Sequence, residues 1–202
     1  MMVRDPRLFG TLAWGILLAV LYIVIGVWPR PMPSRVLYDG TVPLPPYRWV
    51  TPPPAQAKNN QPAGAGEAVL GLGAQGSPAV AVSTDDDQAT ITFPAGAIAF
   101  RPGDSVVRIT ITPLDPARLP PPPHDHIIDG NAYRVDVIYQ GSRTPVTLAK
   151  PVTIALEYPV HATEILRVDA AQWTVVAATR FPASQQVVAA IPRLGTFVAA
   201  RH

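Results

Sequence analysis

The residues best suited to chemistry lie in one short segment after a run of four prolines. This segment contains His124, Asp125, His126 and Asp129. Imidazole and carboxylate groups are common ligands of zinc and similar ions. Two histidines that alternate along an extended loop diverge unless they share a strand face, and no further ligand is evident nearby. The segment is therefore a candidate metal site, with a solvated loop as the alternative that the spacing favours.

Other motifs give less support for catalysis or cofactor binding. The run Asp85 to Asp87 has the carboxylates that calcium prefers, but consecutive aspartates before a strand are typical of a turn. No serine lies in a nucleophile-elbow sequence, and the glycine-rich stretch 64–76 lacks the lysine of a phosphate loop. The sequence therefore predicts no catalytic residue and no cofactor.

Three aromatic residues lie in a segment whose composition otherwise suits a spacer. They are Tyr38, Tyr47 and Trp49. A spacer gains nothing from exposing large aromatic side chains, which are normally buried against an apolar surface. We expect at least one of them to pack against the folded domain or against another partner.

The elements that would position these residues begin with an uncharged run over residues 8–28. At about 1.5 Å per residue, a helix of this length reaches roughly 30 Å, the thickness of a bilayer core. The run exceeds the ~7–15 residues of a signal peptide and ends on bulky Val27 and Trp28. A core helix of a soluble domain would carry a polar stripe, and only Thr11 interrupts this run. We therefore expect an uncleaved membrane anchor.

Charges near this run barely decide its orientation, because arginines flank both sides. The tail at residues 1–7 is too short to fold, whereas a long C-terminal domain can be translocated regardless of its charge. We expect a single-pass protein with its N-terminus in the cytoplasm and its C-terminal domain outside it. The lipid bilayer is then the partner of residues 8–28.

Composition limits the remaining function classes. The chain has 202 residues and no cysteine, which excludes disulfides, thiol catalysis and cysteine metal sites. Residues 79–202 carry ten Lys/Arg and eleven Asp/Glu, so this part is nearly neutral. Nucleic-acid binding would require clustered cations, and we predict none.

Proline and glycine dominate the segment after the anchor. Ten prolines lie between residues 29 and 62, and they favour an extended, semi-rigid chain. Glycine and alanine dominate residues 63–77 and suggest a flexible joint. We therefore expect a linker over residues 29–78, with a fully extended length on the order of 150 Å.

Short runs of alternating hydrophobicity follow from about residue 79. They predict an all-β antiparallel sandwich of about seven to nine strands over residues 79–202. The Pro120–Pro123 run cannot form an inner strand and is expected to project as a loop. The expected strands are Ala89–Phe93, Ser105–Thr112, Tyr133–Tyr139, Val152–Tyr158, Ile165–Asp169, Trp173–Thr179, Gln186–Ile191 and Thr196–Ala200.

The order of these strands resembles a known β-sandwich. A Pro-Ala-Gly-Ala turn follows the strand at Ala89, and a Lys-Pro pair at Lys150 opens a later strand. With Gln172–Val175 and Leu194–Ala199, this pattern is similar to the sandwich shared by ankyrins, netrin receptors and the zona occludens protein. The resemblance implies a binding or scaffolding fold. Some members cleave themselves at a His-Phe-Ser motif, but this chain has Gly195-Thr196-Phe197 there.

Two functions remain in competition. The first is a membrane-anchored, extracytoplasmic β-sandwich that binds or scaffolds an unknown protein or cell-envelope partner without catalysis. The alternative is a membrane-tethered, metal-dependent hydrolase centred on the His124–Asp129 loop. A bound metal lost on replacement of His124 and His126 would favour the second.

Overall fold

Alternating burial along short strands produces the fold. In β3 (Ala89–Phe93), Ala89, Ile91 and Phe93 are buried, and the residues between them are more exposed. Successive side chains of a strand point to opposite faces, so such strands cover one core with one face. The computed structural model describes residues 44–202. The predicted tail at 1–7, the predicted membrane span at 8–28 and Tyr38 lie outside the described residues.

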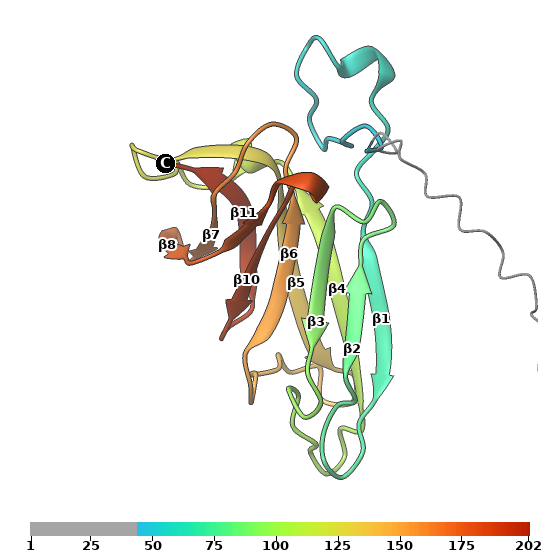
Figure 1. Cartoon of the computed structure of the whole chain (residues 1–202). Helices are drawn as coiled ribbons and strands as arrows, with labels where there is room; N and C mark the ends of the chain where they lie inside the picture. The colour runs from blue at the N-terminus through green and yellow to red at the C-terminus, as the bar shows by residue number, and fades with distance from the viewer. Residues whose placement is uncertain (1–43) are drawn as a thin grey trace, which may run out of the picture. The chain divides into compact units, whose positions relative to one another are not determined.

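Residues 44–202 form eleven strands in two antiparallel sheets (Figure 1). The larger sheet has the order β1-β4-β5-β11-β7-β8, and the smaller sheet has the order β2-β3-β6-β10-β9. The strands of the larger sheet are β1 (Gly66–Gly71), β4 (Val106–Leu114), β5 (Ile127–Tyr139), β11 (Gly195–Arg201), β7 (Glu164–Asp169) and β8 (Gln172–Val176). Those of the smaller sheet are β2 (Val80–Ser83), β3, β6 (Val152–Glu157), β10 (Gln186–Ile191) and β9 (Thr179–Phe181).

The main core lies between the two sheets. Ile91 and Ile154 face inward from the smaller sheet and meet Ile109 and Phe197 of the larger one, all at most 1% exposed. Burying each such side chain contributes roughly 1.5–3 kcal/mol before entropy is counted. Three short 3-10 turns lie outside the sheets: η1 (Ala57–Asn59), η2 (Pro116–Arg118) and η3 (Pro182–Ser184). Among the described residues, none of the helices has the length and apolar character of a membrane span.

A second, smaller core lies on the outer face of the larger sheet. Leu166 and Val198 are fully buried there, and Leu119 packs against them. The indole N–H of Trp173 donates to the carbonyl of Pro121 at 2.8 Å. The Pro120–Pro123 run is not a strand, as the sequence predicted, and the Pro121 carbonyl ties it to Trp173 of β8.

The prediction of an all-β sandwich is confirmed, but its boundaries and strand number are wrong. The folded unit begins at Leu44, so the predicted linker over 29–78 extends too far, and β1 and β2 raise the number above nine. Three glycines of this region, Gly64, Gly66 and Gly76, lie so close to neighbouring backbone that a Cβ would not fit. A Cβ on Gly66 would lie 2.4 Å from the carbonyl oxygen of Ser83, so only glycine lets β1 approach the end of β2.

Candidate functional site

The chain enters the domain as an irregular arm, defined as residues 44–62, at one end of the sandwich (Figure 1). Its prolines leave few backbone N–H groups for a sheet, so side-chain amides close the arm on itself. Trp49 exchanges two hydrogen bonds with the amide of Asn60: its N–H donates to Oδ1 at 2.8 Å, and its carbonyl accepts from Nδ2 at 2.9 Å. The indole N–H of Trp49 donates to Gln56 Oε1 at 2.6 Å. The arm is thereby an ordered loop.

A buried asparagine of β5 holds this loop against the sandwich. Asn131 is 2% exposed, and its Oδ1 accepts from the N–H of Val50 at 2.9 Å. Its Nδ2 donates to the carbonyl of Arg48 at 2.7 Å. The Val50 N–H and the Arg48 carbonyl, which a neighbouring strand could bond, are thus both bonded by one side chain. Buried amides with all partners present are structural contacts of high specificity.

A second buried amide repeats this arrangement on the other side of Arg48. The amide of Gln88 is assigned with its oxygen accepting from the Arg48 N–H at 2.8 Å. In the opposite orientation the amide oxygen would face only acceptors and the amide nitrogen only donors. Its nitrogen then donates to the Arg48 carbonyl at 2.9 Å and to Asp86 Oδ2 at 3.0 Å. Gln88 is also 2% exposed. The arm backbone is therefore held from both sheets.

Tyr47 anchors the arm through its hydroxyl, which accepts from the backbone N–H of Asn131 at 2.8 Å. Burial of this hydroxyl raises the pKa of Tyr47 well above its usual value, and burial likewise raises the pKa of Tyr133 to about 12. The neighbouring residue Gly130 has φ +105°, and a Cβ there would lie 2.5 Å from the Tyr47 oxygen. Glycine is therefore required beneath the tyrosine.

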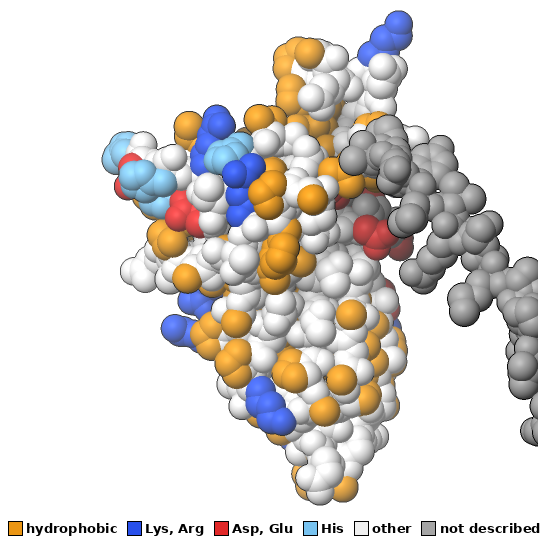
Figure 2. Space-filling view, viewed as in Figure 1, with side chains coloured by type: hydrophobic (Ala, Val, Ile, Leu, Met, Phe, Trp, Pro, Cys, Tyr) orange, Lys and Arg blue, Asp and Glu red, His pale blue; other side chains and the backbone are white. Residues whose placement is uncertain are grey.

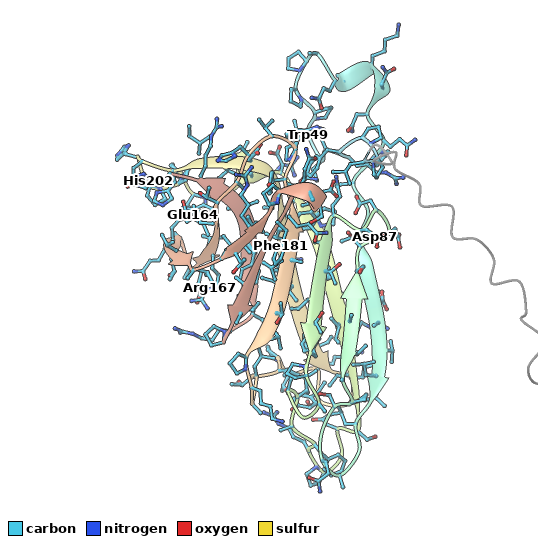
Figure 3. All side chains as sticks on the ribbon, in the orientation of Figure 1. Trp49, Asp87, Glu164, Arg167, Phe181 and His202 are labelled. Atoms are coloured by element: carbon cyan, nitrogen blue, oxygen red, sulfur yellow. The ribbon has the colours of Figure 1, made fainter. Side chains whose placement is uncertain are left out.

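The rings of Tyr47 and Trp49 meet edge to face, with centroids 4.9 Å apart. Both residues are half-buried, so part of each remains exposed to solvent. The sequence predicted contact with the folded domain or with another partner for Tyr38, Tyr47 and Trp49. The structure shows contacts with the domain at Tyr47, and contacts within the arm at Trp49 (Figure 3).

Three hollows adjoin the arm, and two of them differ in the character of their lining. One, of about 430 Å³, is lined by Pro46, Tyr47, Ala55, Gln56, Asn59, Asn60 and Pro159. The other, of about 200 Å³, is here named the acidic cleft and is lined by Pro45, Pro46, Arg48, Asp85, Asp86, Asp87, Gln88 and Glu157. Figure 3 labels Trp49 in the arm and Asp87 at the acidic cleft. Pro46 lines both hollows, and the first, which Tyr47 lines, is here named the aromatic hollow.

The aspartates at the acidic cleft form a turn, as the sequence favoured. Asp86 accepts from the N–H of Gly64 and from the Thr84 hydroxyl, both at 2.6 Å. Glu157 has a pKa raised to about 7, first by burial and then by the charges of Asp86 and Asp87. Near neutral pH this carboxyl therefore exists in both protonation states.

The four predicted metal ligands are not brought together. His126 lies between two carboxylates, with Nδ1 2.6 Å from Asp125 Oδ1 and Nε2 3.2 Å from Glu164 Oε1. His202 joins this group through Nε2, 3.0 Å from Asp125 Oδ2. The hydrogen bond from His126 lowers the pKa of Asp125. Figure 2 shows histidine and acidic side chains gathered at the end of the molecule where Figure 3 labels His202 and Glu164.

Asp129 lies apart from this group because its carboxylate caps another loop. Its Oδ2 accepts from the backbone N–H groups of Val160 and His161. His124 is exposed, and its ring forms no hydrogen bond or ion pair within residues 44–202. Within residues 44–202, no group of three or more His, Cys, Asp and Glu side chains is arranged to hold a metal ion.

Sequence reasoning missed the two amides that define the site. Asn131 follows Asp129 and Gly130, a composition typical of a turn, yet all three lie inside the long strand β5. Gln88 precedes β3 and carries no motif. Only the unexplained aromatics of the arm indicated that something must hold it.

Comparisons with known proteins give no assignment. No protein-family model matches the chain, and no curated protein matches it either.

Proposed function

We propose that this protein is a membrane-anchored, extracytoplasmic β-sandwich that acts as a binding or scaffolding module without catalysis, and that the arm is its contact surface. The observation that carries the proposal is the double amide clamp, in which Asn131 and Gln88 fix the backbone of Arg48. The clamp supports the proposal because a spacer has no use for it.

A fixed loop on a rigid sheet is a common way to build a binding surface. The clamp orders the arm before any partner arrives, so association does not incur the entropic cost of ordering it. The solvent faces of Tyr47 and Trp49 then supply aromatic surface next to a hollow of about 430 Å³. Aromatic side chains at concave sites dominate many protein interfaces. The partner class remains a protein or another component of the cell envelope.

The membrane anchor at residues 8–28 belongs to this proposal and rests on the sequence. Residues 29–43, fifteen in number, separate it from the folded unit that begins at Leu44. Fifteen residues span at most about 50 Å when fully extended. This tether is about a third of the linker length expected from the sequence, which favours partners close to the membrane surface.

Site-specific crosslinking in the full-length chain tests the contact surface. A photo-crosslinking residue at Ala55, which is exposed and lines the aromatic hollow, is expected to give a discrete adduct in native membranes. The same residue at Val69, 53% exposed on β1, is the matched control and should give none. Trp49→Ala should abolish the Ala55 adduct. Equal adducts at both positions, or none at Ala55, would contradict the proposal.

Protease treatment of intact cells tests the topology. With the full-length chain and a C-terminal epitope, an extracytoplasmic domain loses the epitope when protease reaches the outer face of the membrane. A cytoplasmic protein in the same cells serves as the control for intact membranes. Protection of the epitope until the cells are lysed would contradict the proposed orientation.

A further inference from the structure

A separate hollow lies between β7, β8 and the turn that joins β10 to β11, where Figure 3 labels Arg167. We name it the Arg167 pocket. Its volume is about 250 Å³. The walls are mostly apolar and include Val176, Ala177, Ile191 and Pro192, and the charged residues of its lining are Arg167 and Arg193. No carboxylate of residues 44–202 lines it.

Arg167 and Asp104 are the two buried charged residues among residues 44–202, and Arg167 is the one that carries a positive charge. The side chain is 8% exposed, since it lies on the face of β7 that points into the sandwich, the same face as Ile165. Its stem passes Gly195, where a Cβ would lie 3.6 Å from both Cγ and Cδ. Arg167 therefore occupies a position on the inward face of β7, where an apolar side chain such as that of Ile165 would be expected.

No group of the described domain compensates this charge. The Nε of Arg167 is fully buried and has no hydrogen-bond partner. Of the hydrogen bonds and ion pairs between residues 44 and 202, none involves its guanidinium. Arginine remains protonated at all ordinary pH values, so burial cannot neutralise it. A buried Nε–H without an acceptor is costly, and native proteins normally pair such groups.

We propose that the Arg167 pocket binds a small apolar carboxylate, whose carboxylate group pairs with Arg167 and whose hydrocarbon body lies against Val176 and Ile191. The planar fork of arginine matches the two oxygens of a carboxylate. A volume of 250 Å³ holds roughly eight water-sized atoms, at about 30 Å³ each, which sets the ligand size. Arg193 at the rim adds a second cation that favours an anion over a neutral molecule.

This site is independent of the arm, so either proposal can fail alone. The test uses the full-length chain in detergent micelles with methyl-labelled valines, and the probe is hexanoate, which has eight non-hydrogen atoms. Hexanoate is expected to shift the Val176 methyl signals saturably, with a dissociation constant on the order of 1 mM. Hexanol has the same hydrocarbon body without the charge and should bind at least about tenfold more weakly.

Three variants locate the effect. Arg167→Met keeps the volume but removes the charge, and it should weaken hexanoate binding about tenfold or more. Arg167→Lys keeps the charge but loses the fork, and it should retain part of the affinity. Arg134→Met, on the exposed pair with Asp136, is the matched control and should bind as the wild type does.

Several results would overturn the proposal. Equal binding of hexanol and hexanoate would mean that the pocket is merely apolar. Unchanged binding of hexanoate by Arg167→Met would mean that the arginine has another role. The absence of any saturable shift up to about 20 mM hexanoate, twentyfold above the expected constant, would mean that no such site exists. The comparison of hexanoate with hexanol needs no variant, so it holds even if Arg167→Met fails to fold.

Discussion

Asn131 and Arg167 are both polar side chains buried in the larger sheet, but their surroundings differ. Asn131, 2% exposed, bonds the backbone of Arg48 and Val50 with both ends of its amide. Arg167, 8% exposed, has a buried Nε with no partner. The amide of the first residue is fully bonded within the chain, whereas the Nε–H of the second has no acceptor in residues 44–202.

This difference in hydrogen bonding distinguishes a buried residue that stabilises the fold from one that is a candidate for ligand binding. A satisfied buried amide fixes conformation, so changing it should cost stability. An unsatisfied buried cation lowers stability, so removing it should increase stability and reduce ligand binding. The two regions therefore predict mutational effects of opposite sign, which makes the comparison testable.

The largest effect is expected at Asn131. Asn131→Ala leaves the Val50 N–H and the Arg48 carbonyl without partners, and should lower the free energy of unfolding by about 3 kcal/mol. For a domain of this size the melting temperature should fall by about 6–12 °C. Thermal unfolding followed by circular dichroism measures it. Asn59→Ala, an exposed residue of the same arm, should change stability by under about 0.5 kcal/mol. Equal effects would remove the distinction between the two asparagines.

Gly130→Ala should have the next largest effect. The added Cβ would lie 2.5 Å from the Tyr47 oxygen at φ +105°, and we expect a loss of about 2 kcal/mol. The double variant with Tyr47→Phe separates the causes, because it removes the oxygen that the new Cβ meets. The penalty of Gly130→Ala should shrink in that background by about 1 kcal/mol. A penalty unchanged by Tyr47→Phe would place all the strain in the backbone of β5.

The opposite sign is expected at Arg167. Arg167→Met should raise the free energy of unfolding by about 1 kcal/mol in the absence of ligand, because it removes a buried charge and keeps the volume. The melting temperature should rise by about 2–4 °C. Arg108→Met, on an exposed pair 3.1 Å from Glu67, is the control and should lie within about 0.5 kcal/mol of the wild type. Destabilisation by Arg167→Met would show that the cation has an internal role.

The sandwich was predictable because its strands alternate in the sequence. The Gln186–Ile191 strand was predicted with its observed bounds, and Ala89–Phe93 likewise. The edge strand Gly66–Gly71 was missed because its glycines resemble those of a flexible joint. The role of Gly66 depends on its closeness to Ser83, which the sequence does not contain.

The candidate sites were predictable only in part. Unexplained aromatics at Tyr47 and Trp49 indicated a contact, but the residues that hold the arm lie about forty and eighty positions away. His126 and Asp125 were chosen for their types, yet their partners Glu164 and His202 come from β7 and the C-terminus. Arg167 gave no signal, since one arginine in an alternating strand is indistinguishable from an exposed one until its face is known. The resemblance to the ankyrin-type sandwich stays a prediction.

The smallest effect on stability is expected at Glu157, whose surroundings are intermediate between those of Asn131 and Arg167. Glu157 is half-buried at the acidic cleft, and its pKa is raised to about 7, first by burial and then by Asp86 and Asp87. The folded state therefore holds a proton more tightly than the unfolded state, whose pKa is near 4.5. The stability that this proton confers is complete below about pH 4.5 and is lost as the pH rises through about 7.

Glu157→Gln removes this pH dependence. Because the group is partly solvent-screened, we expect the variant to exceed the wild type by only about 0.5–1 kcal/mol at pH 8, and by nothing at pH 4.5. Denaturant unfolding at several pH values measures the difference. Asp87→Asn removes one neighbouring charge from an exposed position with φ 59°, which asparagine tolerates, and should shrink the same difference. A constant difference across pH would mean that the carboxyl of Glu157 titrates alike in both states, and that the acidic cleft stores no unfavourable charge comparable to that of Arg167.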